Sequence, residues 1–354
     1  MFKKFAFLLC CFFICCSHIM ADDFNDSWIG GYSPSLDVDS FEVVVNPVRF
    51  FMSNKRSAAM GDTKAQTSLA WCYSKGFGTG KNMPEALKWY RKTADKGSVD
   101  AMLGAGYLYL LGKDVELNYV ESFKFLSKAV DIMSSKSFVE LLYSSHKDFL
   151  PEAQYNLGVM YVYGGGVDID FVKAVDLFEK AANGGMIDAK VALCEVYCIG
   201  GPGVEKNFNK AYLHIKDAAE AGNGKAQCHL GDFYKDGIAV EVDLKKAFEW
   251  YSKSYGQGVE ESIPKIAEAY FYGDGVEKNL NMAFEILDGA DFPNNIYILG
   301  RLGVFYHNGI GTHKDQQKAL ECFKKSAALG SEWAQGVIDK YYSSEEDSSS
   351  GIED

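Results

Sequence analysis

The sequence has few cysteines with which to build a disulfide framework. Nine occur in the 354 residues, but four of them fall within the first sixteen positions, in a segment that we expect to be removed. The five that remain are odd in number and irregularly spaced: Cys72, Cys194, Cys198, Cys228 and Cys322. A scaffold held together by repeated disulfides is therefore excluded. Cys194 and Cys198 lie one helical turn apart, which is poor geometry for a mutual bridge, but a bridge from either to Cys228 stays open.

Clusters of basic residues are also lacking. Lys and Arg total 36 against 48 Asp and Glu, which gives a net charge of −12. Nucleic acids and anionic lipid surfaces attract clustered Lys and Arg, so the composition argues against both as partners. Peripheral association with a membrane is left open. Most of the negative charge can be understood as a means of keeping the chain soluble.

Motifs for metal or cofactor chemistry are missing or incomplete. His146, His214, His229, His307 and His313 show neither an H-E-x-x-H motif nor a Cys/His spacing typical of zinc sites. We interpret His307 and His313, which flank a predicted loop, as exposed polar residues. The glycine-rich segment 76–81 has the wrong spacing for a phosphate loop, and Asn82 stands where Ser or Thr would bind magnesium. We predict no cofactor, no metal and no small-molecule substrate.

What the sequence does contain is an internal repeat of about 36 residues. Residues 153–185 are its clearest copy, and we count positions within a unit from zero at its first residue. Position 8 is always tyrosine and position 11 is always glycine, and the residues at position 5 and near position 21 are always small. The seven units begin at Ala65, Ala101, Ala153, Ala189, Ala226, Ser262 and Ile298.

Each unit is predicted to form two helices. Apolar and small residues at positions 0, 1, 4, 5 and 8 make one stripe of a first helix, which the glycines at positions 11 to 13 end. A second helix starts near position 18 with residues such as Asn82, Asp170 and Asn279. One such hairpin is too small to bury its apolar face, so neighbouring units must stack. Repeat two has Asp114 in place of the second glycine, and repeat six has Ser262 and Pro264 in its first turn, two departures that bear on local helix geometry.

The segments outside the repeats have distinct compositions. Residues 1–21 combine a basic start, an apolar run and a small residue, as is typical of a secretory signal peptide, with an uncleaved anchor or a lipid attachment as alternatives. Residues 22–46 are predicted to be an irregular lead. Residues 47–342 form the repeat array, which begins with a half repeat, has an insert at about 134–150 and ends with a capping helix. Residues 343–354 are predicted to be a disordered acidic tail.

The unit at 153–185 resembles the Sel-1-like repeat, a relative of the tetratricopeptide repeat. The residues that carry the resemblance are Ala153, Leu157, Gly158, Tyr161, Gly164, Gly166, Val167, Lys173, Ala174, Phe178, Lys180, Ala181, Ala182 and Gly185. The resemblance implies an all-α fold: a right-handed α/α superhelical solenoid of about seven helix-hairpin repeats. Exported proteins of this kind look like the bacterial Sel-1-like factors that act as interaction scaffolds in the envelope, several of them linked to growth inside host cells. We therefore expect an exported, non-enzymatic scaffold in the periplasm, at the outer membrane or on the cell surface, which binds envelope or host proteins.

The resemblance also indicates where a partner would bind. In tetratricopeptide-like stacks the first helices line the concave face, and positions 2, 6, 9 and 10 are expected to point there. In repeats two to four these positions are mostly apolar, and we predict that they form an exposed patch for a partner segment. Its residues are Leu103, Tyr107, Leu110, Tyr155, Val159, Val162, Tyr163, Val191 and Ile199. The alternative is that the insert or tighter packing covers them.

A hydrolase is the second functional hypothesis. A cysteine-rich branch of the same family is associated with β-lactam binding and hydrolysis, which makes a cell-wall or β-lactam-type hydrolase or binding protein the alternative. Ser144 with Lys147, and Ser262 with Lys265, match the motif S-x-x-K. Neither S-D-N nor K-T-G accompanies them, and the paired cysteines of that branch are missing, so we favour chance matches.

Overall fold

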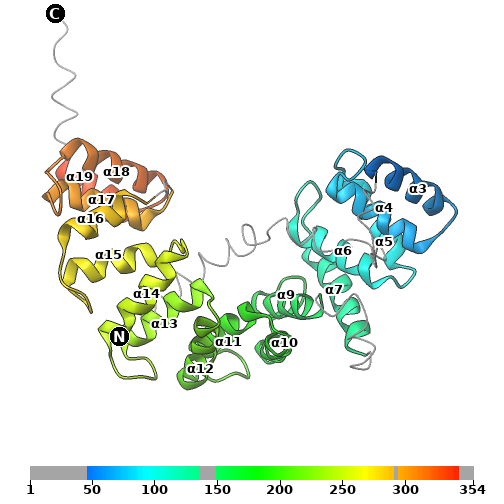
Figure 1. The fold of residues 1–354 in the computed structure, drawn as a ribbon, viewed down its shortest axis with the longest axis horizontal. Helices are drawn as coiled ribbons and strands as arrows, with labels where there is room; N and C mark the ends of the chain where they lie inside the picture. Colours follow the sequence, from blue (N-terminus) through cyan, green and yellow to red (C-terminus); the bar gives the residue numbers. More distant parts are fainter. Residues whose placement is uncertain (1–45, 136–148, 291–293, 343–354) are drawn as a thin grey trace, which may run out of the picture. The chain divides into compact units, whose positions relative to one another are not determined.

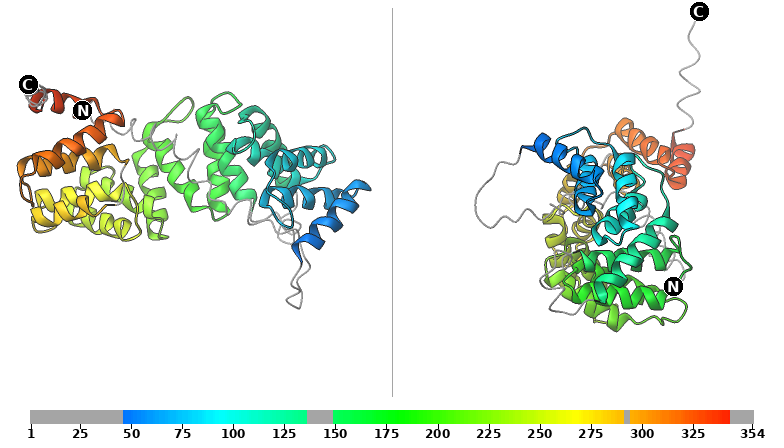
Figure 2. Two further views of the ribbon diagram at one scale, coloured as in Figure 1. Left: turned by 90° about the horizontal axis from the view of Figure 1, so that it is seen from above. Right: turned by 90° about the vertical axis from the view of Figure 1, so that its right-hand side faces the viewer.

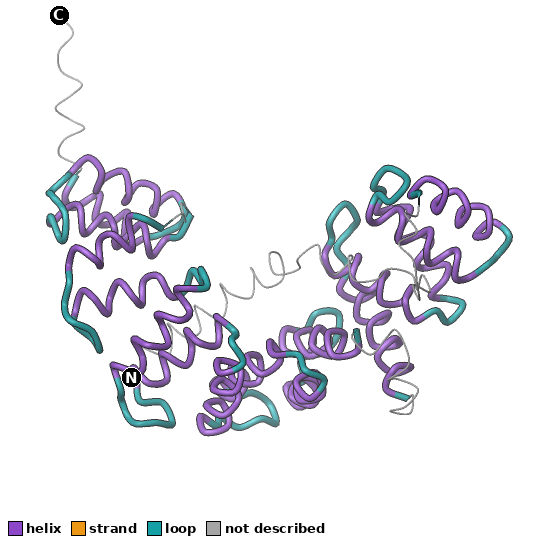
Figure 3. The backbone as a smooth tube through the Cα atoms, in the orientation of Figure 1, coloured by secondary structure: helices purple, strands orange, loops and turns teal. Residues whose placement is uncertain are grey.

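The computed structural model describes residues 46–135, 149–290 and 294–342, and the regular elements in these ranges are all α-helices (Figures 1 and 3). The predicted signal peptide, irregular lead and acidic tail lie outside the described residues, as does most of the predicted insert. The all-α repeat fold expected from the sequence is thus confirmed for the described ranges.

The chain divides into two compact units, with the division inside one helix. Unit 1 runs to Ala189 and includes 202–204, and unit 2 comprises 190–201 and the residues from Glu205 onward. The helices of unit 1 are α3 (Pro47–Ala59), α4 (Thr63–Lys75), α5 (Met83–Ala94), α6 (Val99–Leu111), α7 (Tyr119–Ser134), α9 (Leu150–Tyr163) and α10 (Phe171–Asn183). The division falls in α11 (Ile187–Ile199). The helices that follow in unit 2 are α12 (Phe208–Glu220), α13 (Gly224–Asp236), α14 (Leu244–Gly256), α15 (Ser262–Tyr272), α16 (Leu280–Asp288), α17 (Ile296–Asn308), α18 (Gln316–Ala328) and α19 (Glu332–Tyr341).

The helices pair as seven hairpins, one for each predicted repeat. In unit 1, α4 packs against α5, α6 against α7 and α9 against α10, and in unit 2 α13 packs against α14, α15 against α16 and α17 against α18. In repeat four the loop between α11 and α12 is closed by the hydrogen bond from the Asn207 N–H to the Tyr197 carbonyl. Within each unit a helix packs mainly against the helices before and after it in the chain, as the two views of Figure 2 also show. Contacts of this kind are what a solenoid requires, because no hairpin buries its apolar stripe alone.

One backbone bond closes the loop of all seven hairpins. The N–H at the N-cap of each second helix donates to the carbonyl of the tyrosine at position 8, at 2.8 to 3.0 Å. In repeat three this bond joins Asp170 to Tyr161, while the Asp170 carboxylate accepts from the backbone N–H of Lys173 and the Lys173 ammonium lies 5.2 Å from the Tyr161 ring centre. Gly164 ends the first helix in the left-handed conformation, with φ of 72°. The recurrent Tyr, Gly and Asn or Asp are therefore residues of one turn.

Position 13 keeps a left-handed backbone in repeats two and five, although the sequence has lost its glycine there. Gly166 has φ of 75°, and Asp114 and Ala239, at the same position of repeats two and five, have φ of 60° and 58°. The loop geometry is set by the stacking and cap bonds around it, so these two residues adopt a conformation that glycine would reach without strain.

Ala239→Gly is therefore expected to raise the free energy of unfolding by about 0.5 kcal/mol. A left-handed alanine costs roughly 1–2 kcal/mol, and the greater entropy of glycine in the unfolded chain offsets up to about 1 kcal/mol of the gain. Denaturant unfolding followed by circular dichroism measures the change. The control is Ala182→Gly in α10, where right-handed backbone makes glycine unfavourable by about 1 kcal/mol. Equal losses in the two variants would contradict the prediction.

Repeat six shows the local departure that its sequence indicates. Its first helix, α15, begins at Ser262, which is position 0, whereas α4, α6, α13 and α17 begin two residues earlier in their units. Glu261 precedes it without a side-chain cap bond, and the Ser262 hydroxyl donates instead to the Val259 carbonyl at 2.5 Å. The first turn is thus replaced by a tighter local turn.

Both ends of the array carry polar residues where the inner repeats pack helix on helix. In repeat three a Cβ on Gly158 would lie 2.6 Å from the Phe178 ring, which shows how closely the two helices approach. The terminal helices have Asn54 at the place of Phe178 in α3 and exposed Asp339 at the place of Gly158 in α19. Among the described residues neither helix has a partner in its own hairpin, and a polar face suits such a position.

The last helix is anchored by a histidine that we expected to be exposed. His307 is half-buried, and its Nδ1 lies 2.7 Å from the hydroxyl of Tyr342, which also donates to the Gln316 side chain at 2.8 Å. The prediction for His307 was wrong because the helix that follows the last repeat folds back over it.

Candidate functional site

The first helices of consecutive repeats form a row within each unit, and we call this the first-helix row. Side chains at position 6 of one repeat meet side chains at position 3 of the next. In unit 1 the Asn156 amide donates to the Tyr107 hydroxyl at 3.4 Å. In unit 2 the same positions hold ion pairs. The row thus brings together residues that are 49 apart in the chain in unit 1 and 33 apart in unit 2.

Five of the nine residues predicted to line an exposed patch are buried. Leu103, Tyr107 and Leu110 belong to the hydrophobic core of unit 1, with Tyr107 only 1% exposed. Val162 and Val191 are buried as well. The prediction of an open face is wrong for these five. Leu103, Tyr107 and Leu110 are covered because α6 packs in one core with α5, α7 and α9.

The other four predicted residues keep some access to solvent. Tyr163 is 37% exposed, and Tyr155, Val159 and Ile199 are half-buried. Tyr155 and Val159 lie in α9, where the Tyr155 ring packs on Phe178 at 5.7 Å between centres. Because Ile199 belongs to unit 2, the part of the predicted patch that stays accessible in unit 1 is confined to α9.

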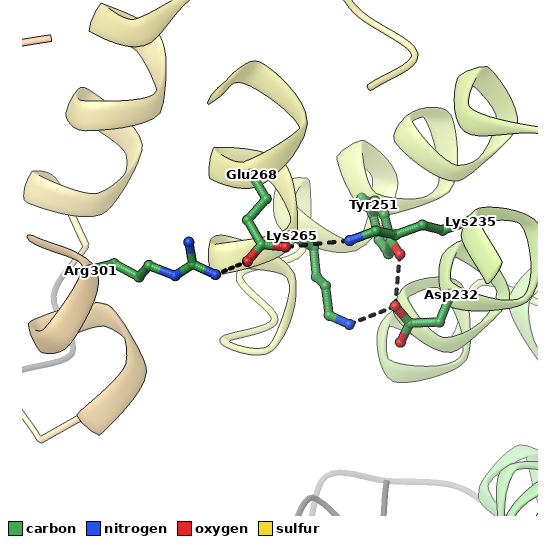
Figure 4. Close-up of polar contacts among 6 residues, drawn as sticks. All are labelled: Asp232, Lys235, Tyr251, Lys265, Glu268 and Arg301. Atoms are coloured by element: carbon green, nitrogen blue, oxygen red, sulfur yellow. Dashed lines mark hydrogen bonds and ion pairs between the residues drawn. The ribbon is translucent and has the colours of Figure 1, made fainter. Parts of the chain in front are cut away.

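Unit 2 carries a charged first-helix row that the sequence interpretation missed (Figure 4). The Asp232 carboxylate on α13 accepts hydrogen bonds from the Tyr251 hydroxyl at 2.7 Å and the Lys265 ammonium of α15 at 2.6 Å. One repeat further, Glu268 on α15 pairs with Arg301 on α17 and with Lys235 on α13 at 3.3 Å. These six side chains link the first helices of repeats five, six and seven.

The charged row follows a rule that is visible in the sequence once the register is known. Position 6 is acidic in repeats four, five and six, and position 3 of the following repeat is His229, Lys265 or Arg301. Burial raises the pKa of Glu195, the acid of repeat four, and this rise is opposed by the charges of His229 and Lys225. Acid at position 6 followed by base at position 3 of the next unit is thus the signal that could have found the row.

Lys265, at the centre of this row, is held in its charged form. Burial alone would lower the pKa of Lys265, but the Asp232 carboxylate more than offsets it and the pKa is raised above its ordinary value. The pKa of Tyr251 is also raised, by burial and then by the same carboxylate. Tyr251 therefore stays a neutral donor and Lys265 a cation, so the contacts join first helices and do not supply a proton-transfer group.

A shallow hollow, open to solvent, lies beside these contacts among α13, α14 and α15. Lys235 and Lys265 form part of its wall, and Phe248 and Tyr251 contribute aromatic surface. Asp274 adds a negative charge. With carboxylates already bonded to both lysines, Asp274 leaves the hollow with one excess negative charge.

The residues considered for serine hydrolase chemistry are engaged elsewhere. The Ser262 hydroxyl donates to a backbone carbonyl, and the Lys265 ammonium is bonded to Asp232, so the two are not arranged as nucleophile and base. Ser144 and Lys147 lie outside the described residues. Among the residues described, no three His, Cys, Asp or Glu side chains are grouped as a metal site would require.

The five cysteines in the described ranges are all free. Burial raises the pKa of Cys72 to about 11. Cys194 is buried and hydrogen-bonded to Cys198, a contact that raises the pKa of Cys194 and lowers that of Cys198. The alternative of a bridge to Cys228 is therefore not realised in this structure.

Of the helices that the structure describes, none has both the length and the apolar character needed to cross a membrane.

Comparison with known proteins gives fungal and bacterial relatives. Chitin synthase regulator SKT5 of Saccharomyces cerevisiae is 26% identical over 250 residues, which are 61% of this chain and 36% of that protein. Chitin synthase regulatory factor 2 of Schizosaccharomyces pombe is 24% identical over 62% of this chain and 43% of its own length. The crystal structure of c5321, a protective antigen of uropathogenic Escherichia coli with an SLR fold, matches with a TM-score of 0.65 and 30% identity over 80% of this chain and 57% of that one.

These relatives correct the expected location. We predicted a bacterial protein exported through a signal peptide to the periplasm, outer membrane or cell surface, whereas the two curated relatives are fungal chitin synthase regulators. The export prediction depended on residues 1–21, which lie outside the described residues. This chain spans less than half the length of either curated relative.

The family itself is settled by a family model described as Sel1 repeat. It matches residues 63–98, 99–131, 151–186, 187–223, 224–259, 265–287 and 299–331. One match falls on each of the seven hairpins. Since the matches cover more than half of the chain and agree with the observed repeats, the chain belongs to the Sel1 repeat family.

Proposed function

We propose that this chain is a non-catalytic scaffold that binds a protein partner along its first-helix row. The observation that carries the proposal is the register of that row: position 6 of one repeat lies beside position 3 of the next in both units, as the contact of Tyr107 with Asn156 and that of Asp232 with Lys265 indicate. A row of this kind offers one extended surface in each unit, and Sel1 repeats are consistent with protein–protein interaction.

The relatives support the class of function. Two curated relatives are named as regulators of chitin synthase, that is, as proteins that act on an enzyme. We extend only that class to this chain: it works through a bound protein partner. An enzyme mechanism has less support, because Ser262 and Lys265 are occupied by structural contacts.

Within unit 1 the proposed contact residues are Tyr155, Val159 and Tyr163 of α9. Tyr163 is the most exposed of the three, and an aromatic ring with a polar tip at the edge of an apolar helix face is a common anchor at protein interfaces. Ile199 in α11 is the proposed contact residue of unit 2. The charges of Lys235, Glu268 and Arg301 fit the polar rim of such an interface.

Tyr155→Ala combined with Tyr163→Ala is expected to weaken partner binding by roughly 30-fold, because an interface anchor contributes about 2 kcal/mol or more. The tagged full chain is used for affinity capture, and the affinity of a recovered protein is then measured in purified form. Tyr255→Ala with Tyr341→Ala, two tyrosines of unit 2 that are 40% and 53% exposed and do not occupy positions 2, 6, 9 or 10 of a first helix, is the matched control and is expected to bind normally.

Circular dichroism and thermal unfolding check that both double variants fold. The proposal fails if the α9 variant keeps the partner as firmly as the control does. It also fails if the purified chain hydrolyses a β-lactam or a muropeptide, because that result would support the alternative of a hydrolase.

A further inference from the structure

A second surface of unit 1 exposes aliphatic side chains at the starts of two consecutive second helices. Leu117 and Val120 at the start of α7 are 49% and 62% exposed, and Ile169 and Val172 at the start of α10 are 56% and 53% exposed. We call these four residues the loop-edge strip. They lie in the hairpin loops and the first helical turns, away from positions 2, 6, 9 and 10 of the first helices.

The two halves of the strip are held next to each other by the packing of one loop on the next helix. A Cβ placed on Gly166 would lie 2.3 Å from the carbonyl oxygen of Tyr119 and 2.6 Å from the amide nitrogen of Val120. The loop that leads into α10 therefore rests directly on the first turn of α7. The side chains of both repeats consequently form one edge.

Folding does not require aliphatic residues at these loop positions. Leu117 packs over the glycine that ends α6: a Cβ on Gly112 would be 2.8 Å from the Leu117 Cβ. In repeats six and seven the equivalent residues are Lys278 and Lys314, and their methylene stems cover the equivalent glycines at 3.4 and 2.9 Å. A lysine stem thus provides the local packing while its ammonium stays in water. The aliphatic ends of Leu117 and Ile169 add exposed apolar surface without a structural need.

The charges around the strip are mainly negative. Asp114, Glu116 and Asp168 are exposed in the two loops, with Lys113 the exposed cation beside them. The carboxylates nearest the helix starts are paired, Glu121 with Lys124 at 3.1 Å and Asp170 with Lys173 at 3.3 Å. An apolar row bordered by carboxylates complements a segment that has an apolar face flanked by Lys or Arg, and it repels an anionic lipid surface.

The spacing of the strip matches a helix. Each repeat supplies two aliphatic side chains, and neighbouring repeats are about 10 Å apart. A helix rises 1.5 Å per residue, so a partner helix laid across both repeats would meet them with side chains about seven residues apart on one face. We propose that the loop-edge strip binds an amphipathic helix of a partner protein, with Lys or Arg beside its apolar face. This surface is independent of the first-helix row.

The test uses a synthetic 18-residue helical peptide with Leu at positions i, i+3, i+4 and i+7 and Lys elsewhere, and a counterpart with Glu in place of Lys. Binding to the full chain is measured by fluorescence anisotropy. Leu117→Gln with Ile169→Gln is expected to weaken binding of the Lys peptide at least tenfold. This double variant has the same net charge as the unaltered chain, and the Gln methylene groups can still cover the glycines that end α6 and α9. The Glu peptide is expected to bind the unaltered chain at least tenfold more weakly than the Lys peptide.

The matched control is Leu213→Gln with Val242→Gln, two aliphatic residues of unit 2 that are 60% and 62% exposed. It is expected to leave binding unchanged. Equal losses in the two double variants, or unchanged binding in the Leu117 and Ile169 variant, would overturn the proposal. So would specific binding to vesicles containing phosphatidylglycerol that the Leu117 and Ile169 variant loses, since the strip would then be a lipid-binding edge. Thermal unfolding is expected to be the same in all three proteins.

Discussion

Gly166→Ala is expected to lower the free energy of unfolding of unit 1 by about 2–5 kcal/mol. The new Cβ would lie 2.3 Å from the carbonyl oxygen of Tyr119, a backbone atom that cannot rotate away. To this overlap, which costs about 1–3 kcal/mol in a packed site, the left-handed backbone adds roughly 1–2 kcal/mol. Repeat three and repeat two would have to separate, so the loss concerns the stacking of hairpins and not one loop alone.

The control for this prediction separates the overlap from the backbone strain. Gly185 also has a left-handed backbone, with φ of 95°, but a Cβ there would meet nothing within 4 Å. Gly185→Ala is therefore expected to cost only about 1–2 kcal/mol. Chemical denaturation of both variants, followed by far-ultraviolet circular dichroism, measures the difference. If the two alanines cost the same, close approach of the repeat-three loop to α7 is not what requires glycine at position 166.

Glu152→Gln is expected to stabilise the protein at alkaline pH. Burial raises the pKa of Glu152, in the first turn of α9, to about 8 from 4.5. The folded chain thus holds a proton that the unfolded chain releases, and the wild-type protein loses stability as pH rises from about 4.5 to 8. At pH 8 and above the variant should be more stable by about 1–3 kcal/mol, a range that allows for the partial exposure of the side chain.

Near pH 4.5 the two proteins should unfold alike, because the carboxyl group is then protonated in the folded state at little cost. Denaturant unfolding at pH 4.5, 6, 7 and 8.5 gives the profile. Glu116→Gln, in an exposed loop of the same unit, removes an equal charge without uncovering a buried site, and it serves as the control. A gain from Glu152→Gln that is the same at every pH would show that burial of its charge is not the cause.

The two surfaces of unit 1 differ in how they relate to folding. Side chains of the first-helix row mostly serve the core, and of the first helices described in unit 1 only α9 has an exposed tyrosine, Tyr163. The loop-edge strip contributes little to the core, since lysines do the same packing in repeats six and seven. Substitutions in the strip should therefore separate binding from stability more cleanly than substitutions in the row.

Local chemistry could be predicted from the sequence because each rule acts within one unit. The glycine at position 11 ends a helix wherever it occurs, and Asn82, Asp170 and Asn279 cap the second helices as expected. The candidate site was harder. Tyr107 and Tyr163 both lie on the predicted binding face, yet one is 1% and the other 37% exposed. A pattern of positions gives the direction of a side chain but not the distance to the next helix.

The sequence by itself determined the repeat, its period, the two helices of each unit and the residues of the turn, because these follow from propensities and bonds among residues near in the chain. Only the tertiary structure decided what meets across repeats: the pairing of Asp232 with Lys265, the burial of Tyr107 and the contact of Gly166 with Tyr119. Those contacts depend on how closely one hairpin packs on the next. That spacing is set by all the side chains between them together, so no single unit contains it.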